Sequence, residues 1–308
     1  MYEKRYDLEV TVENNNILVA KQVSVAFRIA GKLQKAIYDI DLTVKHGEVL
    51  AIVGESGSGK STFATAVMGL HNPNQTQIKG SILLDGEEVV GKTGDSMSKL
   101  RGTKVGMIFQ NPLTALNPLM KIGQQVMEML AVHEVYPESQ YESRTFQLLE
   151  QVGIPNSKRV ANQFPHQLSG GMRQRVMISI AIANDPDLII ADEPTTALDV
   201  TIQAQILDLI LDVQKKKNAG VILITHDLGV VAEVADTVAV MYAGQLVEKA
   251  SVEELFNNPK HPYTRSLLRS NPSAETVSDD LYVIPGNVPS LSEIEYDKDL
   301  FLARVPWM

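Results

Sequence analysis

The sequence contains no cysteine among its 308 residues. This absence excludes disulfide bonds, thiolate metal sites, cysteine nucleophiles and iron–sulfur clusters held by cysteine. It also fits a protein of a reducing compartment. The length does not limit the fold, because 308 residues allow one large domain or two of modest size.

Long hydrophobic runs and an excess of positive charge are missing as well. No stretch of about 18 apolar residues occurs, so the chain is not expected to span a bilayer, and any membrane role must come through a partner. The first residues, MYEKRYDLEVTVENNN, carry charges where a signal peptide needs an apolar segment, which predicts that the chain is not secreted. Lysine and arginine number 28 against 37 acidic residues, and the net charge of −9 argues against a general nucleic-acid-binding protein.

Short apolar runs rich in β-branched residues alternate with helix-like segments, a pattern that predicts an α/β protein with a largely parallel sheet. The run EVLAIV is almost continuously apolar, as is typical of a strand buried on both faces. Between 111 and 185 the periodicity turns helical, which predicts a helical insert. The expected strands are 17–27, 38–45, 48–53, 78–86, 104–109, 187–192, 220–225 and 237–242, with a helix over 200–217.

After Asn258 the sequence becomes rich in Pro, Ser and Asn. We interpret 259–308 as an appended extension rather than a second core. The chain ends on the hydrophobic string RVPWM, from which we expect that it stops short of a longer tail. There is no internal repeat.

The string GESGSGKS, residues 54–61, fits the pattern G-x-x-x-x-G-K-[ST] and lies between a buried strand and a helix-like segment. Glycines let the backbone curl around phosphate groups, and the helix N-terminus adds partial positive charge. Lys60 is expected to reach the β- and γ-phosphates of a nucleotide, and the Ser61 hydroxyl to bind Mg²⁺. The alternative is an ordinary Gly/Ser-rich turn. The candidate nucleotide contacts in this loop are Gly54, Ser56, Gly57, Ser58, Gly59, Lys60, Ser61 and Thr62.

Two acidic residues follow the apolar run DLIIA. In a parallel sheet, ligands bind at the carboxyl ends of the strands, where Asp192 and Glu193 are expected to lie. Asp192 is predicted to hold Mg²⁺ through a water molecule, and Glu193 to act as general base for the water that attacks the γ-phosphate. The alternative is a solvated turn after a strand.

The string LSGGM, from Leu168 to Met172, precedes a segment with good helix patterning. Ser169 is predicted to cap that helix, and Gly170 and Gly171 allow its backbone to approach an anion closely. The string resembles the signature motif of the ABC ATPases. So does the order of the motifs along the chain, which is the phosphate loop, Gln110, LSGGM, the acidic pair and then His226.

Several assignments come from this resemblance alone. Gln110 is similar to the Q-loop glutamine that contacts Mg²⁺ and the attacking water, and His226 to the switch histidine that touches the γ-phosphate. Asp199 resembles the D-loop aspartate of the dimer interface, although by itself it is equally well a helix cap. Phe27 matches the aromatic residue that stacks on adenine, although an apolar strand end would hold a phenylalanine in any case. The resemblance thus implies catalytic roles for Glu193, His226 and Gln110.

The resemblance also implies a domain organisation. An ABC ATPase domain, 1–258, comprises a P-loop NTPase (RecA-like) core of 1–111 and 186–258 and a helical subdomain of 112–185. Its N-terminal part is an antiparallel β subdomain, and the C-terminal extension follows at 259–308. In this family two ATPase domains meet head to tail, and the signature serine of one caps the phosphates bound to the other. Since this chain has one phosphate loop and one signature, a complete site requires a second chain.

The strings HPYT and VIPGNVPSL in the extension are similar to the C-terminal region of the ATPase subunits of oligopeptide and dipeptide importers. This resemblance implies Mg-ATP as cofactor, a second and non-identical ATPase subunit, two transmembrane permease subunits and an extracellular peptide-binding protein. It also implies a peripheral location on the cytoplasmic face of the cell membrane. Many members carry cysteines suited to an iron–sulfur cluster here, and this chain has none.

Other functions remain as alternatives. An ABC importer for another solute, such as nickel or a sugar, is the nearest, because the solute never touches this subunit. Chromosome-maintenance and repair ATPases insert a long coiled coil between the two motifs, whereas Lys60 and Ser169 are only 109 positions apart, without heptads. A translation-type ABC protein would normally have two such domains, and Glu193 argues against a regulator that binds nucleotide without turnover.

Overall fold

The structure is a computed structural model that describes residues 15–196, 198–270, 282–294, 296 and 299–305. Residues 1–14, which carry most of the segment that argues against secretion, and 306–308, at the end of the RVPWM string, lie outside this part. No helix in the described part combines the length and the apolar character needed to cross a membrane.

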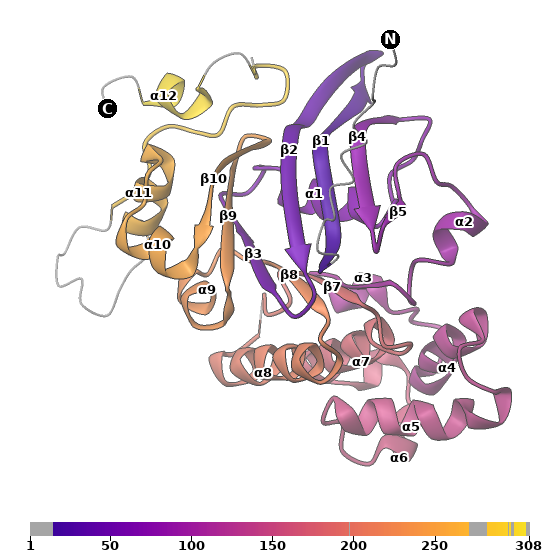
Figure 1. Cartoon of the computed structure of the whole chain (residues 1–308). Coiled ribbons are helices and arrows are strands. Elements are labelled where there is room, and N and C mark those ends of the chain that lie inside the picture. The colour runs from indigo at the N-terminus through magenta and orange to yellow at the C-terminus, as the bar shows by residue number, and fades with distance from the viewer. Residues whose placement is uncertain (1–14, 197, 271–281, 295, 297–298, 306–308) are drawn as a thin grey trace, which may run out of the picture.

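An antiparallel sheet in the order β2-β1-β4-β5 forms one layer (Figure 1). Strands β1 (Asn16–Ile29) and β2 (Lys32–Lys45) form a long hairpin whose two-residue turn, Ala30 and Gly31, has positive φ at both positions. Such a turn matches the right-handed twist of the paired strands. Strand β4 (Thr76–Leu84) pairs with the other side of β1, and the short β5 (Glu87–Glu88) pairs with β4 at the edge of the sheet.

The second sheet has six strands in the order β10-β9-β3-β8-β7-β6. The five strands from β9 to β6 run parallel, and β10 pairs antiparallel to β9 at the edge. Such parallel pairing needs helical crossovers, which the segments between the strands supply. The strands are β3 (Val49–Val53), β6 (Val105–Ile108), β7 (Leu188–Asp192), β8 (Gly220–Ile224), β9 (Thr237–Tyr242) and β10 (Gln245–Ser251).

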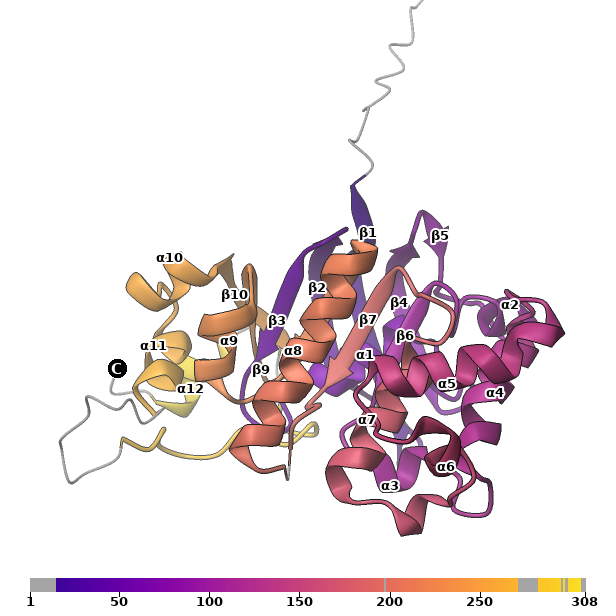
Figure 2. The ribbon, with the colours of Figure 1, turned by 90° about the horizontal axis from the view of Figure 1, so that it is seen from below.

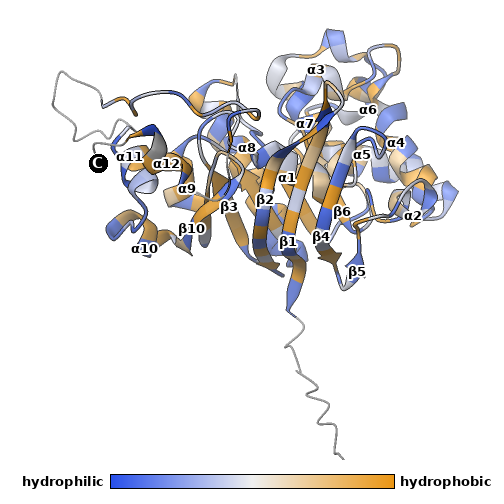
Figure 3. Ribbon diagram, turned by 90° about the horizontal axis from the view of Figure 1, so that it is seen from above, coloured by the Kyte–Doolittle hydropathy of each residue, from blue (hydrophilic) through white to orange (hydrophobic). Residues whose placement is uncertain are grey.

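The parallel strands are buried on both faces, which explains their nearly continuous apolar sequences. In β3, Leu50 and Ile52 belong to the core shared with the antiparallel sheet, while Ala51 and Val53 belong to a separate core on the opposite face. Figure 3 shows hydrophobic colour running along the strands at the centre of the molecule. Neighbouring residues of β3 therefore pack into two different cores, one on each face of the parallel sheet.

Helix α1 (Lys60–Val67) follows β3, and α2 (Asp95–Ser98) precedes β6. From β6 to β7 the chain is helical and builds its own core around residues such as Leu130, Leu148 and Val176. This insert comprises α3 (Pro112–Ala115), α4 (Ile122–His133), the short 3-10 helices Glu138–Gln140 and Pro165–Gln167, α5 (Tyr141–Gln151), α6 (Ser157–Ala161) and α7 (Gly170–Ala181). Helices α8 (Val200–Lys217) and α9 (Leu228–Val234) complete the crossovers.

The last helices are α10 (Val252–Asn257), α11 (Pro262–Arg269) and α12 (Leu300–Arg304). Figure 2 shows them at one end of the molecule, opposite α4, α5 and α6. Tyr263, Phe301 and Val305 join Val53 and Tyr242 in one hydrophobic cluster. The described part of the extension thus completes a core on the edge of the parallel sheet.

The predicted fold class is confirmed: a largely parallel sheet, an antiparallel N-terminal sheet and a helical insert are all present. The sequence pattern did not predict β5 or β10. Strand β10 is half-exposed and antiparallel at a sheet edge, so its sequence QLVEKAS lacks the apolar run that marks a buried strand. The domain boundaries at 111, 186 and 258 stay a prediction.

Candidate nucleotide-binding site

The site is built at the carboxyl ends of four neighbouring parallel strands. The phosphate loop follows β3, His226 comes after β8, and Gln110 comes after β6. Asp192 is the last residue of β7, and Glu193 follows it directly. Parallel strands end at the same edge of a sheet, so side chains far apart in sequence meet there.

The phosphate loop needs glycine at its two ends. Gly54 has φ 148°, and a Cβ added there would lie 2.1 Å from the carbonyl oxygen of Met241. Gly59 has φ 100°, and its added Cβ would lie 2.6 Å from a methyl group of Ile37. The loop is therefore pressed against β9 and β2, and a side chain at either position would displace it.

Lys60 is almost fully buried at the start of α1. Its ammonium group donates hydrogen bonds to the carbonyl oxygens of Gly54 at 2.8 Å and Glu55 at 2.9 Å, and to the Ser58 hydroxyl at 3.3 Å. Burial lowers the pKa of Lys60, and the charges of Glu193, Asp192 and Glu55 oppose that shift. The Lys60 ammonium group is thus held by acceptors of its own loop, and phosphate oxygens could replace these acceptors when a nucleotide binds.

Ser61 and Asp192, each predicted to bind Mg²⁺, lie next to each other. The Ser61 hydroxyl donates a hydrogen bond of 3.2 Å to Oδ1 of Asp192. Asp192 is buried, and burial raises the pKa of its carboxyl group, while the Ser61 hydrogen bond acts in the opposite direction. A hydroxyl oxygen and a carboxylate oxygen therefore stand side by side next to the phosphate loop.

Glu193 is the centre of the site. Its Oε2 accepts hydrogen bonds from Nε2 of Gln110 at 2.7 Å and from the Thr196 hydroxyl at 2.9 Å. Its Oε1 faces Nδ1 of His226 at 3.6 Å. The residue has φ 46°, an uncommon backbone conformation for a non-glycine residue, and its N–H donates to the carbonyl oxygen of Ile224 at 2.9 Å. This strained position, fixed by β8, turns the carboxylate toward its three neighbours.

The signature residues form a second group. Ser169 caps α7 by accepting a hydrogen bond from the Met172 N–H at 3.3 Å, and Asp199 caps α8 in the same way through Ile202 at 3.0 Å. An added Cβ on Gly171 would lie 3.2 Å from Ile202, so the LSGGM turn lies against the start of α8. Ser169, Gly170 and Asp199 are exposed, and none of them lines the cavity beside the phosphate loop.

Phe27 lies on β1 and does not line the cavity beside the phosphate loop. Its ring makes an edge-to-face contact with His71, which follows α1, at 5.4 Å between ring centroids. Nε2 of His71 in turn lies 3.1 Å from the carbonyl oxygen of Thr62. Phe27 is half-buried, and its role in stacking on adenine stays a prediction.

A cavity of about 240 Å³ opens beside the phosphate loop. It is lined by Glu55, Ser56, Lys60, Glu193 and His226, together with Leu228 of α9 and Leu267 of α11. The C-terminal extension thus reaches the site. Tyr263 accepts a hydrogen bond from the Glu55 N–H, and Arg304 pairs with the Glu55 carboxylate.

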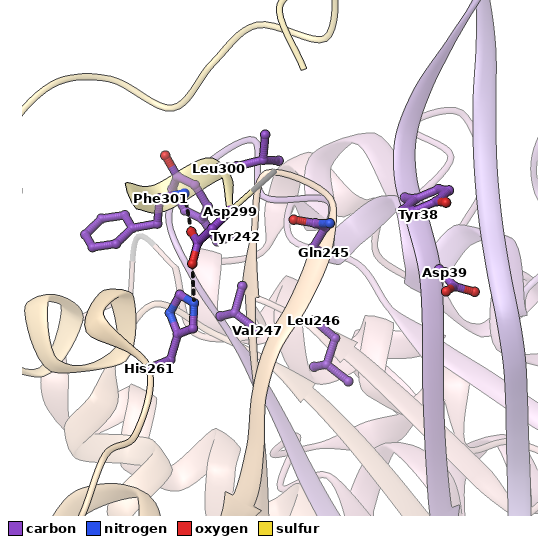
Figure 4. Close-up of a pocket in the computed structure, with 10 residues that line it drawn as sticks. All are labelled: Tyr38, Asp39, Tyr242, Gln245, Leu246, Val247, His261, Asp299, Leu300 and Phe301. Carbon is purple, nitrogen blue, oxygen red and sulfur yellow. Dashed lines mark hydrogen bonds and ion pairs between the residues drawn. The ribbon is translucent and has the colours of Figure 1, made fainter. Parts of the chain in front are cut away.

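A second cavity, of about 290 Å³, lies between β2, β10 and the extension (Figure 4). On its extension side, Nε2 of His261 lies 3.7 Å from Oδ2 of Asp299. His261 accepts a hydrogen bond from the Tyr263 N–H at 3.1 Å, and Asp299 accepts one from the Phe301 N–H at 2.9 Å, so each residue caps its helix. Burial lowers the pKa of His261, and the Asp299 charge opposes this shift. The pair joins α11 to α12.

Sequence reasoning missed Thr196, Glu55, Tyr263 and Arg304. Thr196 lies three positions after Glu193, and a turn there brings its hydroxyl back to the Glu193 carboxylate. A predicted turn after the acidic pair could therefore have identified Thr196. Glu55 lies inside the phosphate loop but occupies an unspecified position of its pattern. The contacts of Tyr263 and Arg304 with Glu55 span 208 and 249 positions, and no local pattern reveals them.

Solved structures share this architecture. The ATP-binding cassette MJ0796, in a dimeric post-hydrolysis state bound to ADP and Pi, is 28% identical with a TM-score of 0.68, covering 76% of this chain and 98% of its own. The cassette cbiO1 of Clostridium perfringens, part of an ABC transporter complex, is 29% identical with a TM-score of 0.67, covering 79% of this chain and 92% of its own.

Curated relatives are closer in sequence. The oligopeptide transport ATP-binding protein OppD of Lactococcus lactis subsp. lactis is 91% identical over 96% of this chain and 88% of its own length. OppD of Bacillus subtilis is 51% identical over 90% of this chain and 78% of its own length. The dipeptide transport ATP-binding protein DppD of Lactococcus lactis subsp. cremoris is 46% identical over 89% of this chain and 79% of its own length.

Two family models match the chain. The model described as "ABC transporter" matches residues 37–196, and the one described as "Oligopeptide/dipeptide transporter, C-terminal region" matches 247–299. The chain therefore belongs to the ABC transporter family, among its oligopeptide and dipeptide transport ATP-binding proteins.

Proposed function

We propose that this chain is the ATP-hydrolysing subunit of a membrane importer of oligopeptides or dipeptides. The observation that carries the proposal is the placement of Glu193 between Gln110, Thr196 and His226, beside the phosphate loop. The relatives named for oligopeptide transport and the matched C-terminal region support the solute class. Nickel and sugars remain the alternative solutes.

The residues divide the work between binding and chemistry. Lys60 and the backbone N–H groups of the loop bind the phosphates, with Ser56, Gly57, Ser58 and Thr62 completing the cradle. Oε2 of Glu193 is held by Gln110 and Thr196, so Oε1 is the atom that accepts the proton of the attacking water. His226, next to Oε1, contacts the γ-phosphate.

The oxygen donors next to the loop fit Mg²⁺. Mg²⁺ is usually bound by one or two carboxylates together with substrate phosphates and waters. Ser61 and Asp192 offer a hydroxyl and a carboxylate within 3.2 Å of each other, and Gln110 offers an amide oxygen. Bound there, the ion would neutralise part of the phosphate charge.

A complete site takes residues from two chains. Ser169, Gly170, Gly171 and Asp199 are set apart from the phosphate loop of their own chain, and three of them are exposed. They would cap the nucleotide held by a second, non-identical ATPase subunit, with Phe27 stacking on the adenine. The pair would act on two permease subunits at the cytoplasmic face of the cell membrane, and an extracellular binding protein would deliver the peptide.

The experiment is reconstitution of the complex in liposomes. The chain is purified from its native membrane together with its associated subunits and inserted into liposomes. ATP is supplied on the side of the liposome membrane where this chain lies, and uptake of a labelled peptide is measured. We expect uptake with the unmodified chain and none with Glu193→Gln, while the exposed Glu253→Gln serves as the matched control. Peptide uptake that continues in Glu193→Gln would overturn the catalytic assignment, and uptake of a metal ion or sugar instead of peptide would overturn the solute class.

A further inference from the structure

The phosphate loop contains an acidic residue at a place that must accept an anion. Glu55 lines the cavity together with Lys60, and its charge is one of those that act on the pKa of Lys60. An unpaired carboxylate beside a triphosphate would repel it, because like charges in a partly buried site are weakly screened. Neutralising the Glu55 charge would therefore favour nucleotide binding at this loop.

Arg304 neutralises that charge from the C-terminal extension. Its Nη1 donates to Oε2 of Glu55 at 2.7 Å and its Nη2 to Oε1 at 3.2 Å, a two-point pair. Other donors of the guanidinium are taken by the carbonyl oxygens of Pro285 at 2.7 Å and Gly286 at 2.9 Å. The Arg304 side chain is only 5% exposed, so the pair is shielded from solvent on the arginine side.

Tyr263 fixes the same residue through its backbone. Its buried hydroxyl oxygen accepts a hydrogen bond of 2.8 Å from the Glu55 N–H. Burial raises the pKa of Tyr263, which keeps the phenol neutral. The Glu55 carbonyl oxygen, in turn, accepts the hydrogen bond from Lys60. The extension therefore contacts both the carboxylate and the backbone of Glu55, the residue whose carbonyl oxygen binds Lys60.

We propose that Arg304 and Tyr263 are positioning residues for nucleotide binding, and that docking of the C-terminal extension switches the phosphate loop into a state that accepts ATP. This inference rests on the proposed function, because it deepens the role of the same loop. The His261–Asp299 pair joins the two helices that carry Tyr263 and Arg304, so both contacts form together when the extension docks.

The test removes the two charges singly and together in the full chain, in the Glu193→Gln background so that ATP is not consumed. We expect Arg304→Ala to weaken ATP binding about tenfold, and more at low ionic strength than at high. Adding Glu55→Gln to Arg304→Ala removes the unpaired charge and should recover most of that loss. Arg304→Lys, which keeps the charge but not the two-point geometry, should fall in between.

The outcomes distinguish this proposal from the alternative that Arg304 only stabilises the packing of the extension. If the double variant binds ATP as weakly as Arg304→Ala, or if Arg304→Ala binds as tightly as its parent, the proposal is wrong. Arg269→Ala is the matched control, because Arg269 is an exposed arginine of the same extension that lies against Tyr282. Should Arg304→Ala fail to fold, the comparison is made between Arg304→Lys and Arg304→Lys with Glu55→Gln. A parent chain that does not bind ATP at all would refute the proposed function instead.

Reciprocity gives a second measurement. If the extension favours nucleotide binding, ATP must favour docking of the extension to the same degree. Hydrogen exchange of the amides in 299–305 should therefore slow when ATP is added to the parent chain, and this protection should disappear in Arg304→Ala. Equal exchange with and without ATP in the parent chain would contradict the coupling.

Discussion

The side-chain amide of Gln110 donates a hydrogen bond of 2.7 Å to Glu193, although the two residues are 83 positions apart. Strands β6 and β7 pair in parallel, so the residues that follow them meet at one sheet edge. The hydrogen bond joins the start of the helical insert to the proposed general base. Movement of the insert would therefore change the position of Glu193.

Gln110→Glu places a second carboxylate against Glu193. Two carboxylates this close cannot both be ionised without a large cost, so they would share a proton at neutral pH and the base would be occupied. We expect the acid limb of the ATPase profile to move to higher pH, whereas Gln110→Ala, which removes only a neutral donor, should lower kcat and move the limb much less. The measurement is kcat for phosphate release as a function of pH, and equal profiles for the two variants would show that the contact is not formed during turnover.

Glu193→Gln removes the proton acceptor and keeps the size of the side chain. General-base catalysis contributes about 10²- to 10⁴-fold to a rate, so we expect kcat to fall by that amount while ATP affinity stays within about threefold. Steady-state phosphate release and equilibrium binding of ATP check the two halves of this prediction. Glu253→Gln, at an exposed position of α10, should hydrolyse ATP like the unmodified chain.

Asp192→Asn should stabilise the nucleotide-free protein while abolishing magnesium-dependent hydrolysis. Burial raises the pKa of Asp192 above that in the unfolded chain, so the folded state binds the proton more readily. The ionised carboxylate therefore costs stability above the folded-state pKa, and the cost disappears as the pH falls below the unfolded-state pKa. Urea unfolding should show the advantage of the variant at neutral pH and its loss in acid. A variant less stable than the parent at neutral pH would contradict this sign.

Gly54→Ala tests whether the phosphate loop is pressed against β9. The added methyl group would lie 2.1 Å from a backbone oxygen, so we expect a loss of about 3 kcal/mol or more in the free energy of unfolding. The matched control is Gly31→Ala, which also has positive φ but has nothing within 4 Å of the added atom. Its cost should be only the backbone term of about 1–2 kcal/mol. Equal losses in urea unfolding would show that the close approach is absent in solution.

The sequence by itself determined the parts whose chemistry is local. The phosphate loop lies within 54–61 and follows an apolar strand, so the pattern, the spacing and the setting can be read from consecutive residues. The helix caps at Ser169 and Asp199 were also predictable, since a cap acts on an N–H three positions away. The parallel sheet followed from strands that are apolar on both faces.

Only the tertiary structure decided which distant residues meet. Strand order places Gln110, Glu193 and His226 side by side, and this order depends on packing between layers that no single segment encodes. Strand β10 was not predicted, because a half-exposed strand at the edge of a sheet does not need the apolar run that marks a buried strand. The contacts of Arg304 and Tyr263 with Glu55 arise because the extension completes a core on the edge of the sheet, which brings the end of the chain onto a loop near its beginning.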